Sequence, residues 1–274
     1  MKKVLAIVVT YYPEEKLLKE NIFSFIDCVD KVLIWENTAA SDKLKYRFVS
    51  HKKAEYCGDG INSISRALNY AWQYAKKYGY DYLLTMDQDS VWENFEIFRK
   101  KIVSNPFAPV GIYCPDVFDK NINNEFEECN MAITSGMFIP VGVINQIGGW
   151  NELFEIDSVD DEFCLHAHSL GIKTYVVKGA IMKQIFGFPQ TIHVLGHVWI
   201  LRNYAPFRLY NVFKDNIILI KRYPQFDYIK ENFKESWLRY IKFVILFESD
   251  KVKKLVAIAK GIIAGLRYKE HFRE

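Results

Sequence analysis

Tyr-Leu-Leu-Thr-Met-Asp-Gln-Asp-Ser, residues 82–90, is a short apolar run that ends in two carboxylates separated by one residue. A strand that ends this way aims both side chains out of the carboxyl edge of its sheet, where open α/β sheets bind ligands. Mg²⁺ or Mn²⁺ prefers such oxygen ligands and completes its coordination with substrate phosphate oxygens. Asp87 and Asp89 are therefore candidate metal ligands. An isolated motif of this kind is also compatible with a solvated turn in which Ser90 caps the next helix.

Strand and helix patterns alternate on both sides of this run. We expect strands over 4–10, 31–36 and 110–114, and helices over 14–26, 63–77 and 93–103. The helix over 63–77 rests on apolar residues at the 3.6-residue period, and it leads directly into the strand before Asp87. This order predicts an α/β fold with a mostly parallel central sheet and flanking helices.

Composition places the chain among globular proteins of a reducing compartment. Its 274 residues are 50% hydrophobic, enough for one large core or a core domain with a helical appendage. The five cysteines are scattered and include no C-x-x-C pair, which argues against a disulfide framework and a structural zinc site. The apolar run after Lys3 is too short for a signal peptide and meets Thr10 and Pro13 instead of a cleavage site. We therefore expect a cytoplasmic protein.

The charge changes sign near Arg202. Residues 202–274 hold 16 Lys and Arg against 8 Asp and Glu, a net of +8, whereas the whole chain carries only +3. Helices are expected over 207–222, 226–247 and 252–268, and their uncharged runs are far shorter than the roughly 20 apolar residues of a membrane span. Two interpretations stay open: peripheral contact with a membrane surface, and plain packing against the preceding domain. No nucleic-acid partner is expected, and a homo-oligomer is compatible with the sequence.

A second acidic cluster follows about 70 residues after Asp89. It comprises Asp157, Asp160, Asp161 and Glu162, at the start of an expected helix. Ser158 with Asp161 resembles a capping box, which could explain one or two carboxylates but not four. A general base that deprotonates a hydroxyl must lie apart from a metal that stabilises the leaving group. Two separate acidic sites meet that requirement.

The histidines are weaker candidates. His166 and His168 are two residues apart on an expected helix and so face different directions. His193 and His197 have the spacing of some zinc helices, but Gly196 disfavours a helix and no Glu follows His193. His193 gains weight only as a third metal ligand beside Asp89.

Short motifs recur in a characteristic order along the chain. The first half contains Ile7-Val8-Val9-Thr10-Tyr11, Trp35-Glu36-Asn37, Ala67-Leu68-Asn69 and Thr85-Met86-Asp87-Gln88-Asp89-Ser90. The second half contains Ile133-Thr134-Ser135-Gly136, Ile147-Gly148-Gly149-Trp150, the acidic run over 154–165, His193-x-Leu195-Gly196 and Pro206-Phe207-Arg208-x-Tyr210. In this order they resemble the family 2 inverting glycosyltransferases of GT-A fold, in particular the bacterial rhamnosyltransferase branch. The resemblance covers most of residues 4–222.

The resemblance implies a GT-A catalytic domain over 1–201, with a donor half of about 1–115 and an acceptor half of about 116–201, followed by a helical region over 202–274. It implies inverting transfer of a sugar from a nucleotide-diphosphate donor, with dTDP-L-rhamnose expected, to a hydroxyl of a lipid-linked cell-surface polysaccharide intermediate. Mg²⁺ or Mn²⁺ would bridge the diphosphate.

The resemblance also assigns roles to residues. Thr10, Glu36 and Asn37 would line the base and ribose pocket. Asp87 and Asp89, with His193, would surround the metal. Asp160 would be the catalytic base with Asp157 and Glu162 nearby, and the sugars would lie near Ser135, Gly136 and Trp150.

The chain departs from the family pattern at several positions. His166 stands where the family usually has Arg, Glu36 replaces a more common Asp, and the run over 61–65 replaces the usual Asn-x-Gly-Ile-Ala. These departures leave a UDP-hexose donor as an alternative. A metal-dependent nucleotidyltransferase is less favoured, since the chain lacks a Gly-rich triphosphate loop. A non-catalytic carbohydrate- or membrane-binding protein, in which the acidic clusters are caps and solvated faces, is the third alternative.

Overall fold

The computed structural model describes residues 2–117, 122–184, 190–194 and 197–269, without the side chains of 190, 192–194, 197 and 200. Contacts within the chain divide it into two compact units, Met1–Ile185 and Phe186–Glu274, which we describe separately. Arg202, where the charge changes sign, lies inside the second unit. The domain boundary placed there from the sequence stays a prediction.

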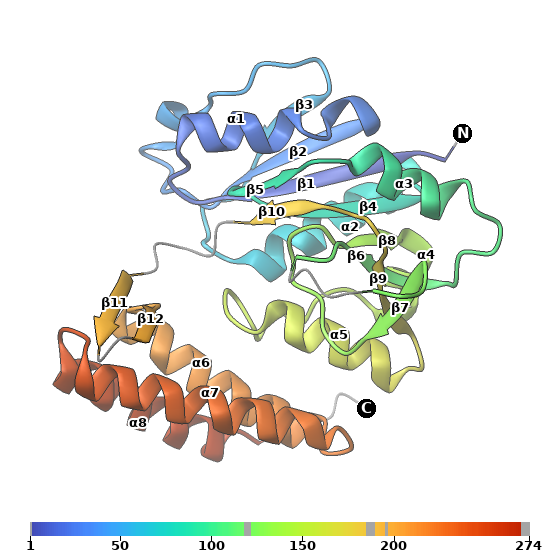
Figure 1. Ribbon diagram of the computed structural model, residues 1–274. Helices are drawn as coiled ribbons and strands as arrows, with labels where there is room; N and C mark the ends of the chain where they lie inside the picture. The colour runs from blue at the N-terminus through green and yellow to red at the C-terminus, as the bar shows by residue number, and fades with distance from the viewer. Residues whose placement is uncertain (1, 118–121, 185–189, 195–196, 270–274) are drawn as a thin grey trace. The chain divides into compact units, whose positions relative to one another are not determined.

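An eight-stranded sheet forms the centre of the first unit (Figure 1), in the order β3-β2-β1-β4-β8-β6-β9-β7. Its strands are β1 (Val4–Thr10), β2 (Lys31–Glu36), β3 (Ala54–Cys57), β4 (Tyr82–Asp87), β6 (Gly111–Cys114), β7 (Phe126–Cys129), β8 (Phe138–Pro140) and β9 (Lys173–Val177). The first four of these in space, β3 to β4, run parallel to one another, whereas β8 runs antiparallel to both of its neighbours. The predicted α/β fold with a mostly parallel sheet is therefore confirmed.

Burial explains why β1 has no alternation of polar and apolar residues. All seven of its residues are buried, because β1 lies inside the sheet and both of its faces are covered. The predicted bounds of the strands over 4–10 and 31–36 agree with β1 and β2. The core around them also contains Leu18, Phe25 and Phe98 from the flanking segments.

The helices of the donor half agree with the sequence except at one end. They are α1 (Glu15–Phe23), α2 (Ile64–Tyr78) and α3 (Phe95–Val103). In α2, the Ser63 hydroxyl accepts a hydrogen bond from the amide of Arg66, and Gly79 ends the helix in the left-handed conformation. The helix expected over 14–26 ends earlier, since the Ser24 hydroxyl donates to the Asn21 carbonyl and a short 3₁₀ turn over Ile26–Cys28 follows.

Residues 116–201 contain α4 (Val141–Ile147) and α5 (Val159–Ser169). A small ribbon pairs β5 (Ser90–Trp92) with β10 (Met182–Gln184), so Ser90 begins a strand and does not cap a helix. That alternative for the Asp-Gln-Asp-Ser motif is wrong. The chain returns from the second half to the motif through β10, a pairing that no local pattern in residues 82–92 indicates.

In its described residues, the second unit contains three helices and a hairpin. These are α6 (Pro206–Arg222), α7 (Asp227–Leu246), α8 (Lys251–Arg267), and strands β11 (Gln190–Val194) and β12 (His197–Leu201). The three helices confirm the predicted ones within a few residues, whereas the hairpin was not predicted. The core of the second unit consists of Leu209, Phe213, Val244 and Ile258. Among the described residues, no helix is long and apolar enough to cross a membrane.

Candidate active site

Strand register brings three predicted site residues to one edge of the sheet. Thr10 ends β1 and lies opposite Glu36, the last residue of β2. Val9 lies opposite Asp87, the last residue of β4. Parallel strands that end together form the ligand-binding edge of an α/β sheet. Thr10, Glu36 and Asp87 therefore lie at the same edge of the sheet, and their roles stay predictions.

The backbone of the Asp-Gln-Asp turn is held from two sides. On one side, the Asn21 amide donates to the carbonyl of Asp87 at 2.8 Å and also to the carbonyl of Ser90. On the other side, the Ser135 hydroxyl accepts from the amide of Asp87 at 3.1 Å and donates to the Ser90 hydroxyl at 2.7 Å. Asn21, Ser90 and Ser135 are all buried, so the turn is preorganised before any ligand binds.

Gln88 links this turn to the loop after β1. Its side-chain oxygen accepts from the amide of Tyr11 at 2.7 Å, and its side-chain nitrogen donates to the Tyr11 carbonyl at 3.2 Å. The two strand ends are thereby joined across the ligand-binding edge. Sequence reasoning assigned no role to Gln88 or to Asn21, although the position of Gln88 between two carboxylates is a usable signal.

Asp87 and Asp89 are the two carboxylates predicted to hold a divalent cation. The Asp87 carboxylate accepts from the side-chain nitrogen of Gln184 on β10 at 3.3 Å. Burial raises the pKa of the Asp89 carboxyl above its usual value, a cost that a bound cation would offset. Among the described residues, no three His, Cys, Asp or Glu side chains group as a metal site. Two carboxylates suffice for Mg²⁺ or Mn²⁺ when substrate phosphates and water supply the remaining ligands.

His193, the predicted third ligand, is not placed by this structure. Its backbone belongs to β11, but its side chain lies outside the described residues. His193 lies on β11 and His197 begins β12, and these strands pair antiparallel, so the two residues do not have the geometry of a zinc-binding helix.

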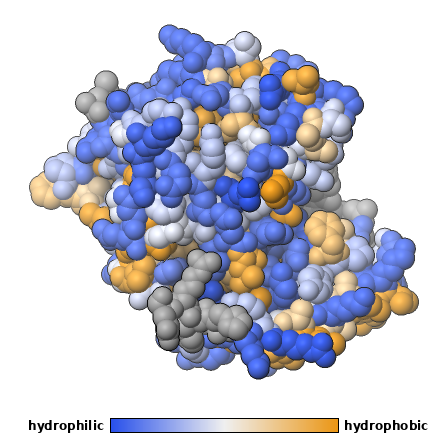
Figure 2. All heavy atoms as spheres, turned by 180° about the vertical axis from the view of Figure 1, so that it is seen from behind, coloured by the Kyte–Doolittle hydropathy of each residue, from blue (hydrophilic) through white to orange (hydrophobic). Residues whose placement is uncertain are grey.

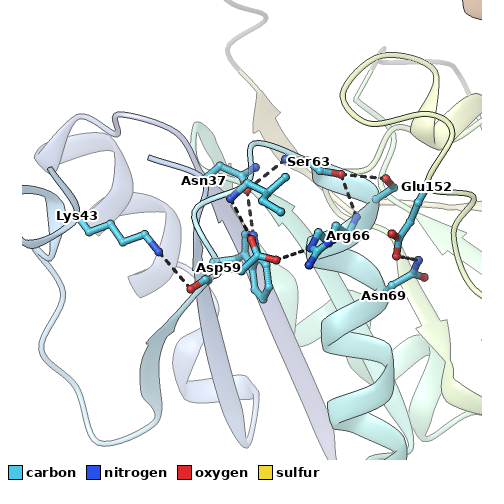
Figure 3. A network of polar contacts seen from close by, with 11 residues as sticks. Asn37, Lys43, Asp59, Ser63, Arg66, Asn69 and Glu152 are labelled. Carbon is cyan, nitrogen blue, oxygen red and sulfur yellow. Dashed lines mark hydrogen bonds and ion pairs between the residues drawn. The ribbon is translucent and has the colours of Figure 1, made fainter. Parts of the chain in front are cut away.

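Buried polar groups surround the predicted nucleotide pocket. The Thr10 hydroxyl donates to the carbonyl of Trp35 at 3.0 Å. The side-chain oxygen of Asn37 accepts from the Trp35 indole at 3.0 Å and from the Ser63 amide at 3.4 Å. Figure 3 shows Asn37 at the centre of these contacts, between the end of β2 and the start of α2. The oxygen of Asn37 is thus engaged in the protein, and its side-chain nitrogen is the group that a base could meet.

Glu36 is buried and carries an ion pair. Arg47 donates to its two carboxylate oxygens at 3.1 and 2.8 Å, and the Glu36 side chain is only 5% exposed. The bidentate pair compensates the buried charge. Because each carboxylate oxygen can accept more than one hydrogen bond, Glu36 keeps capacity for a ribose hydroxyl.

A polar network joins α2 to the loop that carries Trp150 (Figure 3). The Asn69 side chain accepts from the amide of Trp150 and donates to its carbonyl, both at 2.8 Å, and it also donates to Glu152 at 3.0 Å. Nearer the start of α2, Arg66 pairs with Asp59. Gly149 is required here, because it has φ of +87° and a Cβ at this position would collide with the Trp72 ring.

Trp150 itself is a core residue in this structure. Its ring stacks on Phe163 of α5 with centroids 4.3 Å apart, and it is 4% exposed. Ser135 and Gly136 are also buried. Their predicted position near the sugars stays a prediction. What the structure does give them is a supporting role: Trp150 packs the acceptor half, and Ser135 holds the Asp-Gln-Asp turn.

The second acidic cluster lies at the N-terminal end of α5. Asp157 precedes the helix, Asp160 and Asp161 occupy its first turn, and the buried Glu162 accepts from the Asn151 side chain at 3.1 Å. The predicted capping box is wrong, since the N-cap residue Ser158 makes no capping hydrogen bond with its side chain. The carboxylate of Asp160 instead accepts from the amide of Asp161 at 3.0 Å.

Mutual repulsion and burial perturb these carboxyl groups. Burial and the charges of Asp160 and Asp157 raise the pKa of Asp161 to about 8. Burial is also the main cause that raises the pKa of Asp160, against which backbone hydrogen bonds from Asp161 and Thr134 act. Such shifts are frequent where carboxyl groups exchange protons with substrates. His166 lies further along α5, in its last turn.

One short segment, residues 133–136, connects the two acidic sites. The backbone of Thr134 acts on the Asp160 carboxyl and lowers its pKa against the effect of burial, and the Ser135 hydroxyl accepts from the amide of Asp87. Gly136 then donates to the carbonyl of Thr85 in β4 at 2.7 Å. A Cβ at Gly136 would lie 2.8 Å from the Pro115 ring, so only glycine allows this close approach. The fold therefore brings Asp87 and Asp160, 73 positions apart in the sequence, to adjacent residues of one segment.

No protein-family model matches the chain. The dTDP-rhamnosyl transferase RfbF of Shigella flexneri is 24% identical over 207 residues, which are 67% of this chain and 69% of that protein. The structure of GalNAc-T7 with UDP, GalNAc and Mn²⁺ has a TM-score of 0.56 at 10% identity. That match covers 81% of this chain and 48% of GalNAc-T7, so the chain spans about half the length of that protein.

A second solved structure is similar over almost the whole chain. The mannosyltransferase PcManGT of Pyrobaculum calidifontis, in complex with GDP-Man and Mn²⁺, has a TM-score of 0.55 at 10% identity. The match covers 98% of this chain and 76% of that protein. Both solved structures share the fold of this chain, which agrees with the GT-A fold that the ordered sequence motifs predict, and the relative from Shigella flexneri is consistent with the rhamnosyltransferase resemblance.

Proposed function

We propose that this protein is a metal-dependent inverting glycosyltransferase that moves L-rhamnose from dTDP-L-rhamnose to a hydroxyl of a lipid-linked polysaccharide intermediate. The observation that carries the proposal is the connection between the two acidic sites through residues 133–136. A carboxylate pair for the diphosphate and a separate carboxylate for the acceptor are the two components that a single displacement requires.

The donor half would bind and orient the nucleotide sugar. Thr10, Glu36 and Asn37 lie at the ends of β1 and β2, where the base and ribose would bind. Asp87 and Asp89 would hold Mg²⁺ or Mn²⁺ against the diphosphate. When bound, this cation stabilises negative charge that develops on the leaving nucleotide. The hydrogen bonds from Asn21, Gln88 and Ser135 keep the turn in position throughout.

Asp160 would remove the proton from the acceptor hydroxyl. As the hydroxyl oxygen attacks the anomeric carbon, the proton passes to the Asp160 carboxylate and the bond to the diphosphate breaks. One displacement inverts the anomeric configuration and needs no protein nucleophile. The raised pKa of Asp160 brings its basicity closer to the working pH, which favours proton transfer. Asp157 and Glu162, which flank Asp160 in the sequence, would lie near the Asp160 carboxylate and help to set its pKa.

The donor assignment is the finer part of the proposal. The relative of similar sequence is a dTDP-rhamnosyl transferase, which favours dTDP-L-rhamnose. The two structural neighbours are in complexes with UDP or GDP-Man, and their likeness concerns the fold. A thermal-shift panel of dTDP-rhamnose, UDP-hexoses and GDP-mannose with Mn²⁺ separates these donors, because a selective ligand raises the apparent stability by mass action.

The first test compares two variants that should fail differently. Asp89→Asn should abolish Mn²⁺-dependent binding of the donor in calorimetry. Asp160→Asn should retain donor binding and lose turnover by roughly a hundredfold or more, the usual contribution of a general base. Asp227→Asn, at an exposed residue of α7, serves as the matched control and should behave as the wild type. Normal transfer by Asp160→Asn would show that the base is another residue.

The same assays separate the alternative functions. Release of pyrophosphate from a nucleoside triphosphate would favour a nucleotidyltransferase. Full function after loss of both Asp89 and Asp160 would favour a non-catalytic binding protein. Because the proposed acceptor is lipid-linked, the proposal includes peripheral contact of residues 202–274 with the cytoplasmic face of a membrane. A homo-oligomer stays a prediction.

A further inference from the structure

An exposed apolar stripe runs along the whole length of α8. Its members follow the helical spacing i, i+3, i+4, i+7, i+11 and i+14, and they are Val252, Leu255, Val256, Ala259, Ile263 and Leu266. Val252 is 75% exposed and Leu266 is 61% exposed. At 100° per residue these positions fall within an arc of about 100°, the width of a buried helix face. Figure 2 shows hydrophobic residues as separate patches among hydrophilic ones on the face that it presents.

The opposite face of α8 already packs against α6. Lys254, Ile258, Gly261 and Gly265 are its buried residues. A Cβ on Gly261 would collide with the carbonyl of Tyr210, and one on Gly265 would lie 2.8 Å from the carbonyl of Lys214. The glycines thus permit a close helix contact on one face only. The apolar stripe lies on the other face of α8, which α6 does not cover.

Polar contacts at both ends prevent α8 from rotating its stripe inward. Near the start, the ammonium of Lys254 pairs with Glu248 at 2.8 Å, with both side chains 4% exposed, and donates to the Asn203 side chain at 2.5 Å. Near the end, the ammonium of Lys221 binds the carbonyls of Gly265, Leu266 and Tyr268 at 2.9, 2.6 and 3.1 Å. Rotation would separate a buried ion pair, which is strongly unfavourable. The stripe is therefore held outward.

Basic side chains border this stripe on one side. Lys253, Lys260 and Arg267 recur every seven residues along the same flank, and all three are exposed. Lys253 pairs with Asp250 just before the helix, but α8 itself contains no Asp or Glu. An apolar stripe bordered by Lys and Arg is the pattern of helices that lie in the interface of a lipid bilayer. The charge is complementary to anionic headgroups.

We propose that α8 binds the surface of an anionic membrane, with its axis in the membrane plane. Val252, Val256 and Ile263 would enter the boundary between headgroups and acyl chains, and Lys260 and Arg267 would contact lipid phosphates. A second copy of the chain fits this face less well, because a two-fold contact would bring two purely basic helices together. The proposal deepens the proposed membrane contact by naming the surface that makes it.

Vesicle flotation tests the apolar part of this surface. The full chain should float with vesicles of phosphatidylglycerol and phosphatidylcholine. Val256→Asp with Ile263→Asp should lower the partition coefficient at least tenfold. Leu238→Asp with Ile97→Asp, at two exposed apolar residues of α7 and α3, is the matched control and should bind as the wild type. The proposal would be overturned if both double variants lost vesicle binding equally, or if Val256→Asp with Ile263→Asp lost none.

A second comparison tests the basic flank and the rival occupant. Lys260→Ser with Arg267→Ser should weaken binding to anionic vesicles roughly tenfold, with little change for pure phosphatidylcholine. Sedimentation equilibrium of the same proteins addresses self-association. Two results together would refute membrane binding and assign this face to a second copy of the chain. The wild type would form a dimer that does not bind vesicles, and Val256→Asp with Ile263→Asp would dissociate that dimer.

These experiments distinguish a failure of the proposed lipid binding from a failure of the proposed sugar transfer. Asp160→Asn should bind vesicles as the wild type does, because Asp160 belongs to the first unit. The α8 variants should retain binding of the soluble donor. Loss of transfer activity in every assay, with flotation intact, would reject the proposed reaction and leave the membrane surface standing. Circular dichroism confirms that each variant is folded.

Discussion

Three aspartates lie close together in the first turn of α5 and in the segment just before it. Asp157, Asp160 and Asp161 repel one another, and burial adds to the cost of their charge. The positive end of the helix dipole partly offsets that cost. A site that keeps such carboxylates gives up stability for chemistry, which is the usual arrangement at functional positions.

Replacement of Asp161 by Asn should therefore stabilise the protein in a pH-dependent way. The folded-state pKa of Asp161 is about 8, above its unfolded value, so its folded form retains the proton more strongly. The wild type loses stability as the pH rises from about 4 to 8, and Asp161→Asn removes that loss. Thermal melting at pH 5 and pH 8 measures it. We expect a gain of several degrees at pH 8 and a much smaller gain at pH 5.

An equal gain at both pH values would contradict this assignment, since it would arise from packing and not from ionisation. Thr134 and Asp160 are unchanged in the variant, so donor binding provides a control that should match the wild type. Because the three carboxyl groups titrate together, the midpoint observed belongs to the cluster.

Gln88 should act on donor affinity and not on proton transfer. Gln88→Ala removes both hydrogen bonds to the backbone of Tyr11 and frees the loop after β1. We expect the KM for the donor to rise several-fold with kcat nearly unchanged. Gln88→Glu keeps the acceptor for the Tyr11 amide and loses the donor, so its effect should be smaller. Equal effects of the two variants, or a fall in kcat alone, would contradict a positioning role.

Only part of the site was predictable at this scale. The Asp87 and Asp89 pair follows an apolar strand, a pattern that local sequence carries. Asn21 and Ser135, which hold the turn from other elements, leave no periodic signal because each acts through a single long-range hydrogen bond. Their roles depend on the tertiary structure.

At the scale of elements, α2 connects the donor and acceptor halves. The Asn69 side chain bonds both backbone groups of Trp150, whose ring packs on Phe163 of α5. This contact sets the position of the loop that leads to Asp157 and Asp160. The parallel strands and the amphipathic helices of residues 1–115 were predicted, because buried strands appear as continuous apolar runs and half-buried helices repeat apolar residues every 3.6 positions. The β5–β10 ribbon was not, because its strands are short and 90 positions apart.

Asn69→Ala should lower the free energy of unfolding by about 1–3 kcal/mol, because it leaves two backbone groups of Trp150 without their partner. Asn69→Asp retains the acceptor for the Trp150 amide and should lose less. Urea denaturation measures both. Asn145→Ala, which removes one bond to the Trp72 indole, is a control for a single side-chain contact and should cost less than Asn69→Ala. A larger effect in the control would contradict the assignment of Asn69.

At the scale of the whole molecule, the proposed catalytic residues and the proposed membrane-binding helix belong to different compact units. Residues 1–201 carry a net charge of −5, which follows from the chain total of +3 and the +8 of residues 202–274. The acidic sites occupy the first compact unit, and the basic helices occupy the second. A membrane surface that attracts the second unit would therefore not compete for the metal site.

Lys254→Met tests whether the second unit is stable in its own right. The substitution leaves the charge of Glu248 buried without its partner, and breaking a buried pair typically costs about 3–5 kcal/mol. Lys253→Met, at the adjacent exposed position, is the matched control and should have little effect. In calorimetry of the full chain, we expect Lys254→Met to lower the transition of the second unit while Mn²⁺ and donor still raise that of the first. A single transition that falls as a whole would show that the two compact units unfold together, and loss of donor binding in Lys254→Met would show that the first unit depends on the second.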